Sequence, residues 1–297
     1  MNKLSEPAID DEKVFVDVAK SKTYKNDHCK GCQLPKISCE TCTHGNRGKI
    51  LNLKDRVFAR YQFYLQNSNN LNVIKPIKIM SQDEEKLMKD SYKTSKMFQK
   101  VKRQLLENIP EKRRGMCPFC MISEPTTFDH YFSESEYPEY IIFAPNLVPC
   151  CSHCNSVKGN LLFMGDGTSQ KRTFIHFYYD EVPQTQYLKA KFSVDNKIPQ
   201  VSFYLDFEDD SEVINIIKNH FNKLHLLERY KAQSNGILST ECEEIRVWLS
   251  GGMSVEQCVQ LLQIKAQASQ KTNGDNYWEA CLYKAMSESE EQLIKLI

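Results

Sequence analysis

The chain has 297 residues, of which 41% are hydrophobic and 26% charged, a composition typical of a soluble globular protein with one large domain or two ordinary ones. No signal peptide and no apolar run long enough to cross a bilayer can be recognised, so we expect a cytoplasmic protein without a membrane partner. The formal net charge is only +1, which excludes binding to nucleic acid through the charge of the whole surface and leaves only a local basic patch.

Cysteine usage is the first unusual feature. Eight of the twelve cysteines form four Cys-x-x-Cys pairs. Thiols stay reduced in the cytoplasm, so these pairs indicate metal sites rather than disulfides. The other four need no special role: Cys150, Cys242, Cys258 and Cys281.

Residues 1–50 are expected to form a small metal-bound element. Their cysteine set has short spacings that suit a structural zinc site, with an iron–sulfur cluster or redox-active thiols as the alternatives. Whether this element contacts DNA or only covers the fold stays open. The four predicted ligands are Cys29, Cys32, Cys39 and Cys42.

Residues 51–110 show apolar side chains near helical spacing, interrupted by a polar, Asn-rich turn at 67–76. This pattern predicts two helices, the second ending before Pro110 because proline disfavours helical geometry in the preceding residue. Between Lys86 and Arg114 there are ten Lys or Arg against three Asp or Glu. This run is a candidate basic patch, and the alternative is an ordinary solvated helix face.

Residues 111–208 hold a motif region followed by three runs rich in aromatic and β-branched residues, at 173–179, 186–194 and 200–207. These runs predict a small antiparallel sheet. Residues 209–297 return to helical periodicity, with apolar stripes that we interpret as helices packed on a core.

Two Cys-x-x-Cys knuckles frame the motif region. Cys117, Cys120, Cys151 and Cys154 supply four thiolates, the set that tetrahedral structural zinc prefers. Cys150 adjoins Cys151, and we assign Cys151 to the metal because it completes the two-residue spacing. These cysteines predict a zinc ribbon or treble-clef element and say nothing about catalysis.

The segment between the knuckles carries Asp129-His130, then Asn146 in Asn-Leu-x-Pro, then Asn155 directly after Cys154. The gaps suit a strand, a second strand and a helix. This arrangement resembles the HNH, or ββα-metal, endonuclease family. The resemblance implies an α+β fold, with a treble-clef-like ββα core held together by zinc, a small antiparallel sheet and flanking helices.

The resemblance also implies hydrolysis of phosphodiester bonds, with DNA favoured over RNA as the nucleic-acid substrate. Asp129 and Asn155 would hold a catalytic Mg²⁺ or Mn²⁺, and Asn146 would brace the loop between the strands. His130 would be the general base, since neutral imidazole accepts a proton near pH 7. Lys158, one helical turn after Asn155, would contact a phosphate.

Two flanking segments, FYLDF and NYWEACLYKA, are similar to HNH nucleases of bacterial phage defence. This second resemblance implies an antiphage effector and a regulatory partner such as an ATPase. Neither strandedness nor sequence preference can be read from the chain.

Two other readings remain. One is a non-catalytic zinc module that binds nucleic acid, and the other is an adaptor protein built on the helical C-terminal third. Asp129-His130 together with both asparagines favours catalysis, because a pure binder needs none of them. Glu134 and Glu136 are alternative carboxylate ligands, although their turn-like surroundings predict that they face solvent.

Overall fold

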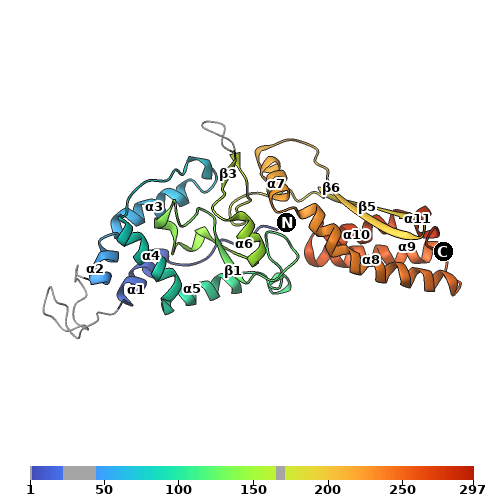
Figure 1. Cartoon of the computed structure of the whole chain (residues 1–297), viewed down its shortest axis with the longest axis horizontal. Helices are drawn as coiled ribbons and strands as arrows, with labels where there is room; N and C mark the ends of the chain where they lie inside the picture. The colour runs from blue at the N-terminus through green and yellow to red at the C-terminus, as the bar shows by residue number, and fades with distance from the viewer. Residues whose placement is uncertain (1, 23–44, 165–170) are drawn as a thin grey trace.

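The computed structural model describes residues 2–22, 45–164 and 171–297. The fold is mixed α+β, with many helices and small antiparallel strand pairs. Figure 1 shows the helices of the first 107 residues and the motif region at one end of the molecule, and the C-terminal helices at the other. The predicted N-terminal zinc ligands Cys29, Cys32, Cys39 and Cys42 lie outside the described residues, so that site stays a prediction.

Helices from the first 107 residues pack on one side of the motif region. In chain order they are α1 (Asp11–Lys20), α2 (Gly45–Leu51), α3 (Lys54–Gln66), the short 3-10 helix η1 (Leu71–Val73), α4 (Gln82–Thr94) and α5 (Lys96–Glu107).

The prediction of two helices between residues 51 and 110 is corrected to three α-helices, because the second helical run is broken at Ser95. The backbone of Ser95 is extended (ψ 117°), and its hydroxyl accepts a hydrogen bond from Phe98 N. A serine in this role caps a new helix. The apolar periodicity continues across the break, so spacing alone did not show it.

The motif region forms a strand pair followed by a helix. Strands β1 (Thr127–His130) and β2 (Leu147–Cys150) are antiparallel, with His130 opposite Leu147. Helix α6 (Ser152–Lys158) starts directly after β2, with Cys151 as its N-cap. The connection between the strands holds η3 (Pro138–Tyr140) and η4 (Ala144–Asn146), and η2 (Glu111–Arg113) precedes the motif region.

The prediction of a strand at 173–179 is wrong. Residues 173–179 form no strand, and the described residues just before them hold the short pair β3 (Phe163–Met164) and β4 (Lys171–Arg172). Beyond β4, the carboxylate of Asp180 accepts from His176 N at 2.7 Å, and Asp180 N donates to His176 O at 3.0 Å, which closes a turn. A short, wholly buried apolar run can belong to a strand or a turn, and its residue types do not separate the two.

The strands predicted at 186–194 and 200–207 are confirmed as the hairpin β5 (Leu188–Asp195) and β6 (Ile198–Leu205). Its two-residue turn, Asn196 and Lys197, has φ of 48° and 63°, as a type I′ turn requires. The sequence places these strands with the motif region in residues 111–208. In the structure the hairpin packs against the C-terminal helices. Asn276 Oδ1, for example, accepts from Tyr187 N and Leu188 N, each at 2.8 Å.

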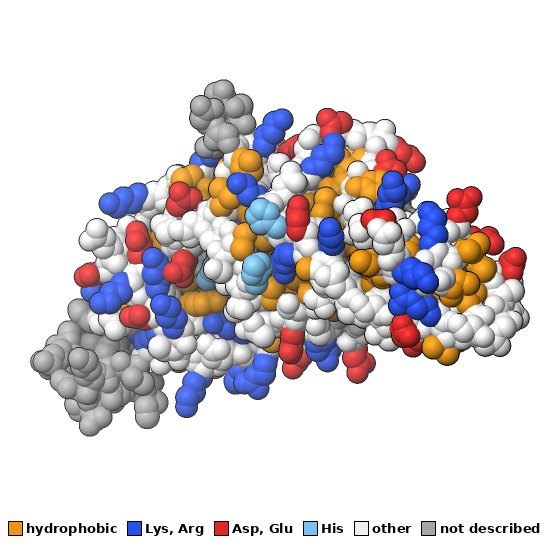
Figure 2. All heavy atoms as spheres, turned by 45° about the vertical axis from the view of Figure 1, so that its right-hand side comes forward, with side chains coloured by type: hydrophobic (Ala, Val, Ile, Leu, Met, Phe, Trp, Pro, Cys, Tyr) orange, Lys and Arg blue, Asp and Glu red, His pale blue; other side chains and the backbone are white. Residues whose placement is uncertain are grey.

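The remaining helices form the C-terminal part of the molecule (Figure 1). They are α7 (Glu212–Lys223), α8 (Leu226–Ser250), α9 (Val255–Asn273), α10 (Trp278–Ser287) and α11 (Glu290–Ile294). In the described ranges, no helix has both the length and the apolar character needed to span a membrane. On the face drawn in Figure 2, Lys and Arg side chains lie among Asp and Glu side chains, in keeping with the net charge of +1.

Candidate functional site

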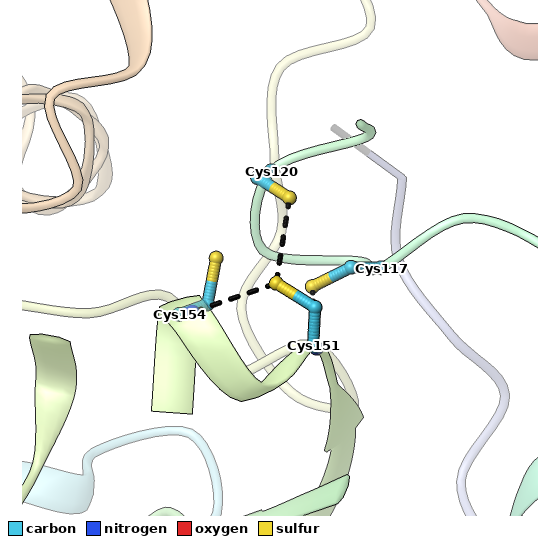
Figure 3. Close-up of side chains that lie close together, drawn as sticks. All are labelled: Cys117, Cys120, Cys151 and Cys154. Carbon is cyan, nitrogen blue, oxygen red and sulfur yellow. Dashed lines mark hydrogen bonds between the residues drawn. The ribbon is translucent and has the colours of Figure 1, made fainter. Parts of the chain in front are cut away.

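The four cysteines of the two knuckles meet at one point (Figure 3). The Sγ atoms of Cys117, Cys120, Cys151 and Cys154 all lie within 4.8 Å of one another, and all four residues are buried. Together they could hold a structural metal ion such as zinc, which suits a buried set of four thiolates. Cys151 belongs to the cluster as predicted. The thiol of Cys150 instead lies 3.4 Å from Thr127 Oγ1.

Backbone turns and backbone hydrogen bonds position the cysteines of this cluster. Met121 has a positive φ of 55°, and its N–H donates to Cys117 O at 2.8 Å, so the first knuckle turns sharply. The second knuckle contributes Cys151, whose backbone N–H donates to Cys117 Sγ at 3.2 Å. An N–H group aimed at sulfur stabilises the thiolate form that binds metal.

Side chains from the C-terminal helices surround the knuckles. His220 Nε2, on α7, lies 2.8 Å from Phe119 O, and Trp278 Nε1, on α10, donates to Met121 O at 3.1 Å. Arg229, on α8, donates to Cys154 Sγ at 3.6 Å. Its guanidinium offsets part of the negative charge that thiolates would bring to the cluster.

The structure brings Asp129, His130 and Asn155 to one cleft of about 730 Å³. Strand β1 and helix α6 supply these residues. Tyr92 from α4 and a face of α5 also line the cleft. The strand–strand–helix arrangement therefore gathers side chains that are 26 positions apart in the chain.

The imidazole of His130 is held in one orientation. Its Nε2 lies 3.0 Å from Ile141 O, and because a carbonyl only accepts, Nε2 carries the proton and Nδ1 keeps its lone pair. The Tyr92 ring lies 4.7 Å away, centre to centre. Burial, with a smaller contribution from the charges of Lys158 and Lys102, lowers the pKa of His130 to about 4. The ring is therefore neutral at neutral pH.

Asp129 is 1% exposed and forms an ion pair through Oδ1, 3.0 Å from Lys158 Nζ. Its other oxygen, Oδ2, is buried and has no hydrogen-bond partner within the described part of the chain. Burial raises the pKa of Asp129, and the ammonium of Lys158 opposes that rise. A buried carboxylate oxygen without a partner is costly unless a cation binds it.

Asn155 offers a second oxygen beside Asp129. Its Nδ2 donates to Thr127 Oγ1 at 3.2 Å and to Phe128 O at 3.5 Å, which fixes the amide against β1. No described residue donates to its Oδ1. An amide oxygen and a carboxylate oxygen lining one cleft suit a hard cation such as Mg²⁺.

Asn146 lies away from the cleft and is completely buried. Its Oδ1 accepts from Phe132 N at 2.8 Å, while its Nδ2 donates to Phe132 O at 3.0 Å and to Tyr140 O at 3.3 Å. The side chain thus braces the connection between β1 and β2, in the geometric role expected from the sequence.

Lys158 departs from its expected place. Its side chain is 0% exposed, and Nζ contacts three oxygens at 3.0 to 3.2 Å, those of Asp129 Oδ1, His130 O and Tyr131 O. All three ammonium hydrogens are therefore used inside the protein. Lys158 does not line the cleft, so the prediction of a phosphate contact is corrected to a structural contact that orients Asp129.

The wall of the cleft formed by α4 and α5 was not expected from the sequence. Tyr92, Lys102 and Arg103 line this wall, and Glu134, which is half-buried rather than facing solvent, also lines the cleft. The basic run from Lys86 to Arg114 was the available signal, but spacing did not show which of its side chains would face β1. His153, between two cluster cysteines, is exposed.

Comparison with known proteins finds a similarity to a phage protein. The chain is 26% identical over 192 residues to "Protein ea31" of Escherichia phage lambda, a match that covers 59% of this chain and 62% of that protein. No family model matches the chain, and no solved structure matches it. The family membership implied by the motif is accordingly a proposal.

Proposed function

We propose that the protein is a metal-dependent, HNH-type endonuclease that hydrolyses phosphodiester bonds in DNA. One observation carries the proposal. Asp129, His130 and Asn155 line the same cleft, where Asp129 Oδ2 has no hydrogen-bond partner among the described residues and the imidazole is neutral. Metal-assisted hydrolysis requires this combination of a base with oxygen ligands.

In the proposed reaction, Nδ1 of His130 takes a proton from a water molecule, which attacks phosphorus in line with the departing oxygen. The P–O bond to that oxygen breaks as the new P–O bond forms, and the leaving oxygen takes a proton from solvent. Ile141 O keeps the ring in the required tautomer by accepting from Nε2. A divalent cation on Asp129 and Asn155, when bound, supplies positive charge beside the phosphate oxygens.

The cysteine cluster has a separate role in this proposal. It ties the loop before β1 to the start of α6. Zinc there would set the position of Asn155 relative to Asp129, so the catalytic site depends on the cluster without including it.

A role in phage defence, with a regulatory partner such as an ATPase, is a further part of the proposal and rests on the two flanking segments. In the folded protein these segments adjoin, because Phe203 lies in β6 and the Asn276 side chain binds the backbone where the paired strand β5 begins. The two similarities thus fall within one packed unit.

The test is cleavage of supercoiled plasmid DNA in Mg²⁺, Mn²⁺ or EDTA. We expect cutting with either metal, none in EDTA, and a loss of at least about a hundredfold in His130→Ala, since general bases contribute about 10² to 10⁴ in rate. His153→Ala is the matched control, because His153 is exposed and lies on α6 outside the cleft.

Equal cutting by His130→Ala and His153→Ala would refute His130 as the base. If the folded, zinc-loaded protein cuts neither plasmid nor single-stranded DNA, the non-catalytic alternatives, a nucleic-acid-binding module or an adaptor, become the better explanation.

A further inference from the structure

Helix α5 turns one of its faces toward the proposed catalytic residues. Gln99, Lys102, Arg103 and Leu106 line the same cleft as Asp129 and His130. Their spacing of three and four residues puts them on one side of the helix. This face belongs to the basic run noted in the sequence, and Lys158 cannot provide the phosphate contact once expected of it.

Arg103 is the cation best placed to meet a ligand. It is exposed and lines the cleft, and no carboxylate of the described residues pairs with it. Other arginines near the motif region are already engaged, such as Arg60 with Glu139 and Arg172 with Asp180, each at 2.8 Å. A planar guanidinium without a carboxylate partner in the described part of the chain suits bidentate contact with a phosphate.

Lys102 lies closer to the proposed base. Its Nζ is 3.4 Å from the centre of the Tyr92 ring and donates to Tyr92 O at 3.3 Å. The same ring lies 4.7 Å from the His130 ring, centre to centre, so Lys102 and His130 share Tyr92 as a neighbour. Both neighbours hold the Tyr92 ring in place, which argues against its stacking on a base of the substrate.

The charge of the cleft agrees with an anionic ligand. Of the acidic residues that line it, Asp129 is neutralised by Lys158, which leaves Glu134 against Lys102 and Arg103. A cation on Asp129 would add further positive charge. The positive charge on the wall formed by α5 therefore attracts the phosphates of a nucleic-acid strand that crosses the opening of the cleft.

From this geometry we propose that Lys102 and Arg103 bind the backbone phosphates of a DNA strand next to the phosphate that is cut. The inference rests on the proposed nuclease function and names its substrate-binding surface. It predicts contacts to backbone rather than to bases, and hence affinity with little sequence preference.

The test measures the binding of a short, fluorescein-labelled DNA duplex by fluorescence anisotropy at several salt concentrations. The background is His130→Ala without added Mg²⁺ or Mn²⁺, so that no cutting occurs and the cysteine cluster keeps its zinc. Arg103→Gln should weaken binding and reduce the slope of log K against log salt by about 0.9, the value for one lost phosphate contact. Lys102→Gln should act in the same direction. Lys100→Gln is the matched control, because Lys100 is exposed on α5 but does not line the cleft.

The outcomes separate this inference from the nuclease proposal. If Arg103→Gln and Lys100→Gln bind alike, or if the duplex does not bind at all, the α5 surface is refuted, even where the unaltered protein cuts plasmid. A reduced slope in Arg103→Gln without any metal-dependent cutting would support the surface and refute the chemistry.

Discussion

At the scale of single residues, the ion pair between Lys158 and Asp129 is the most deeply buried of the ion pairs in the described ranges. Both side chains are almost fully buried, at 0% and 2% exposure. Breaking such a pair leaves one charge without compensation in a low-dielectric interior. The pair also fixes which oxygen of Asp129 stays free, so it matters for stability and for metal binding together.

We therefore expect Lys158→Met to lower the free energy of unfolding by about 3–5 kcal/mol, because Asp129 loses its partner and two backbone carbonyls lose a donor. Urea denaturation followed by circular dichroism measures the change. Lys189→Met is the control, since the ion pair of Lys189 with Asp206 lies at the surface, and it should leave stability nearly unchanged. Equal stability of both variants would contradict a structural role for Lys158.

At the scale of elements, α6 depends on the cysteine cluster. It has seven residues, too few for a helix to be stable by itself in water. Its first turn is held by Cys151, whose Sγ accepts from Cys154 N at 3.4 Å, and by the other cysteines of the cluster. The position of Asn155 is set by the same turn.

Cys154→Ser should accordingly lose one equivalent of bound zinc, together with helix content and DNA cleavage, because structural zinc binding is coupled to folding. Atomic absorption spectroscopy measures the metal. Cys150→Ala is the matched control, as this thiol is buried next to the cluster without belonging to it, and it should keep its zinc.

The same measurement tests the N-terminal cysteines. A second equivalent of zinc that survives in Cys154→Ser would support the site predicted at Cys29, Cys32, Cys39 and Cys42. Full zinc content in Cys154→Ser would instead contradict the assignment of the cluster between the knuckles.

At the scale of the whole molecule, the knuckles lie where the C-terminal helices meet the motif region. Helices α7, α8 and α10 contact the knuckles through the side chains of His220, Arg229 and Trp278. Removing a metal from the cluster should thus loosen the attachment of the C-terminal helices as well as the cleft.

Tryptophan fluorescence can follow this coupling, because the chain has two tryptophans. Trp278 is buried against the first knuckle, whereas Trp248 lies on α8. A strong chelator should shift the emission to longer wavelength as Trp278 becomes hydrated. Trp248→Phe should retain this shift and Trp278→Phe should lose most of it. No shift in the unaltered protein, once its cluster has lost its metal, would show that the knuckles and the C-terminal helices are not coupled.

Several features of the fold and the site follow from short-range sequence alone. The paired Cys-x-x-Cys spacing identified the cluster at Cys117 and Cys151, and the alternating aromatic runs identified the β5–β6 hairpin. Each Cys-x-x-Cys pair and each strand depends on residues close together in the chain, where backbone geometry limits what each spacing can form. Asn146 is a similar case, since its amide binds the backbone of residues at most 14 positions away.

Tertiary packing decided the rest. Lys158 occupies the helix face that the sequence predicted, but long-range burial turned its ammonium toward Asp129 instead of the cleft. The wall of the cleft comes from α5, and periodicity does not specify which of its basic side chains meet β1. The segment after β4 turns rather than extends, and it bonds to distant parts of the chain: Phe174 O accepts from Tyr131 Oη at 3.0 Å, and His176 Nε2 lies 2.8 Å from Tyr64 Oη. In each case the outcome depends on a partner brought near by the fold, so the free energy that decides it is not contained in the local sequence.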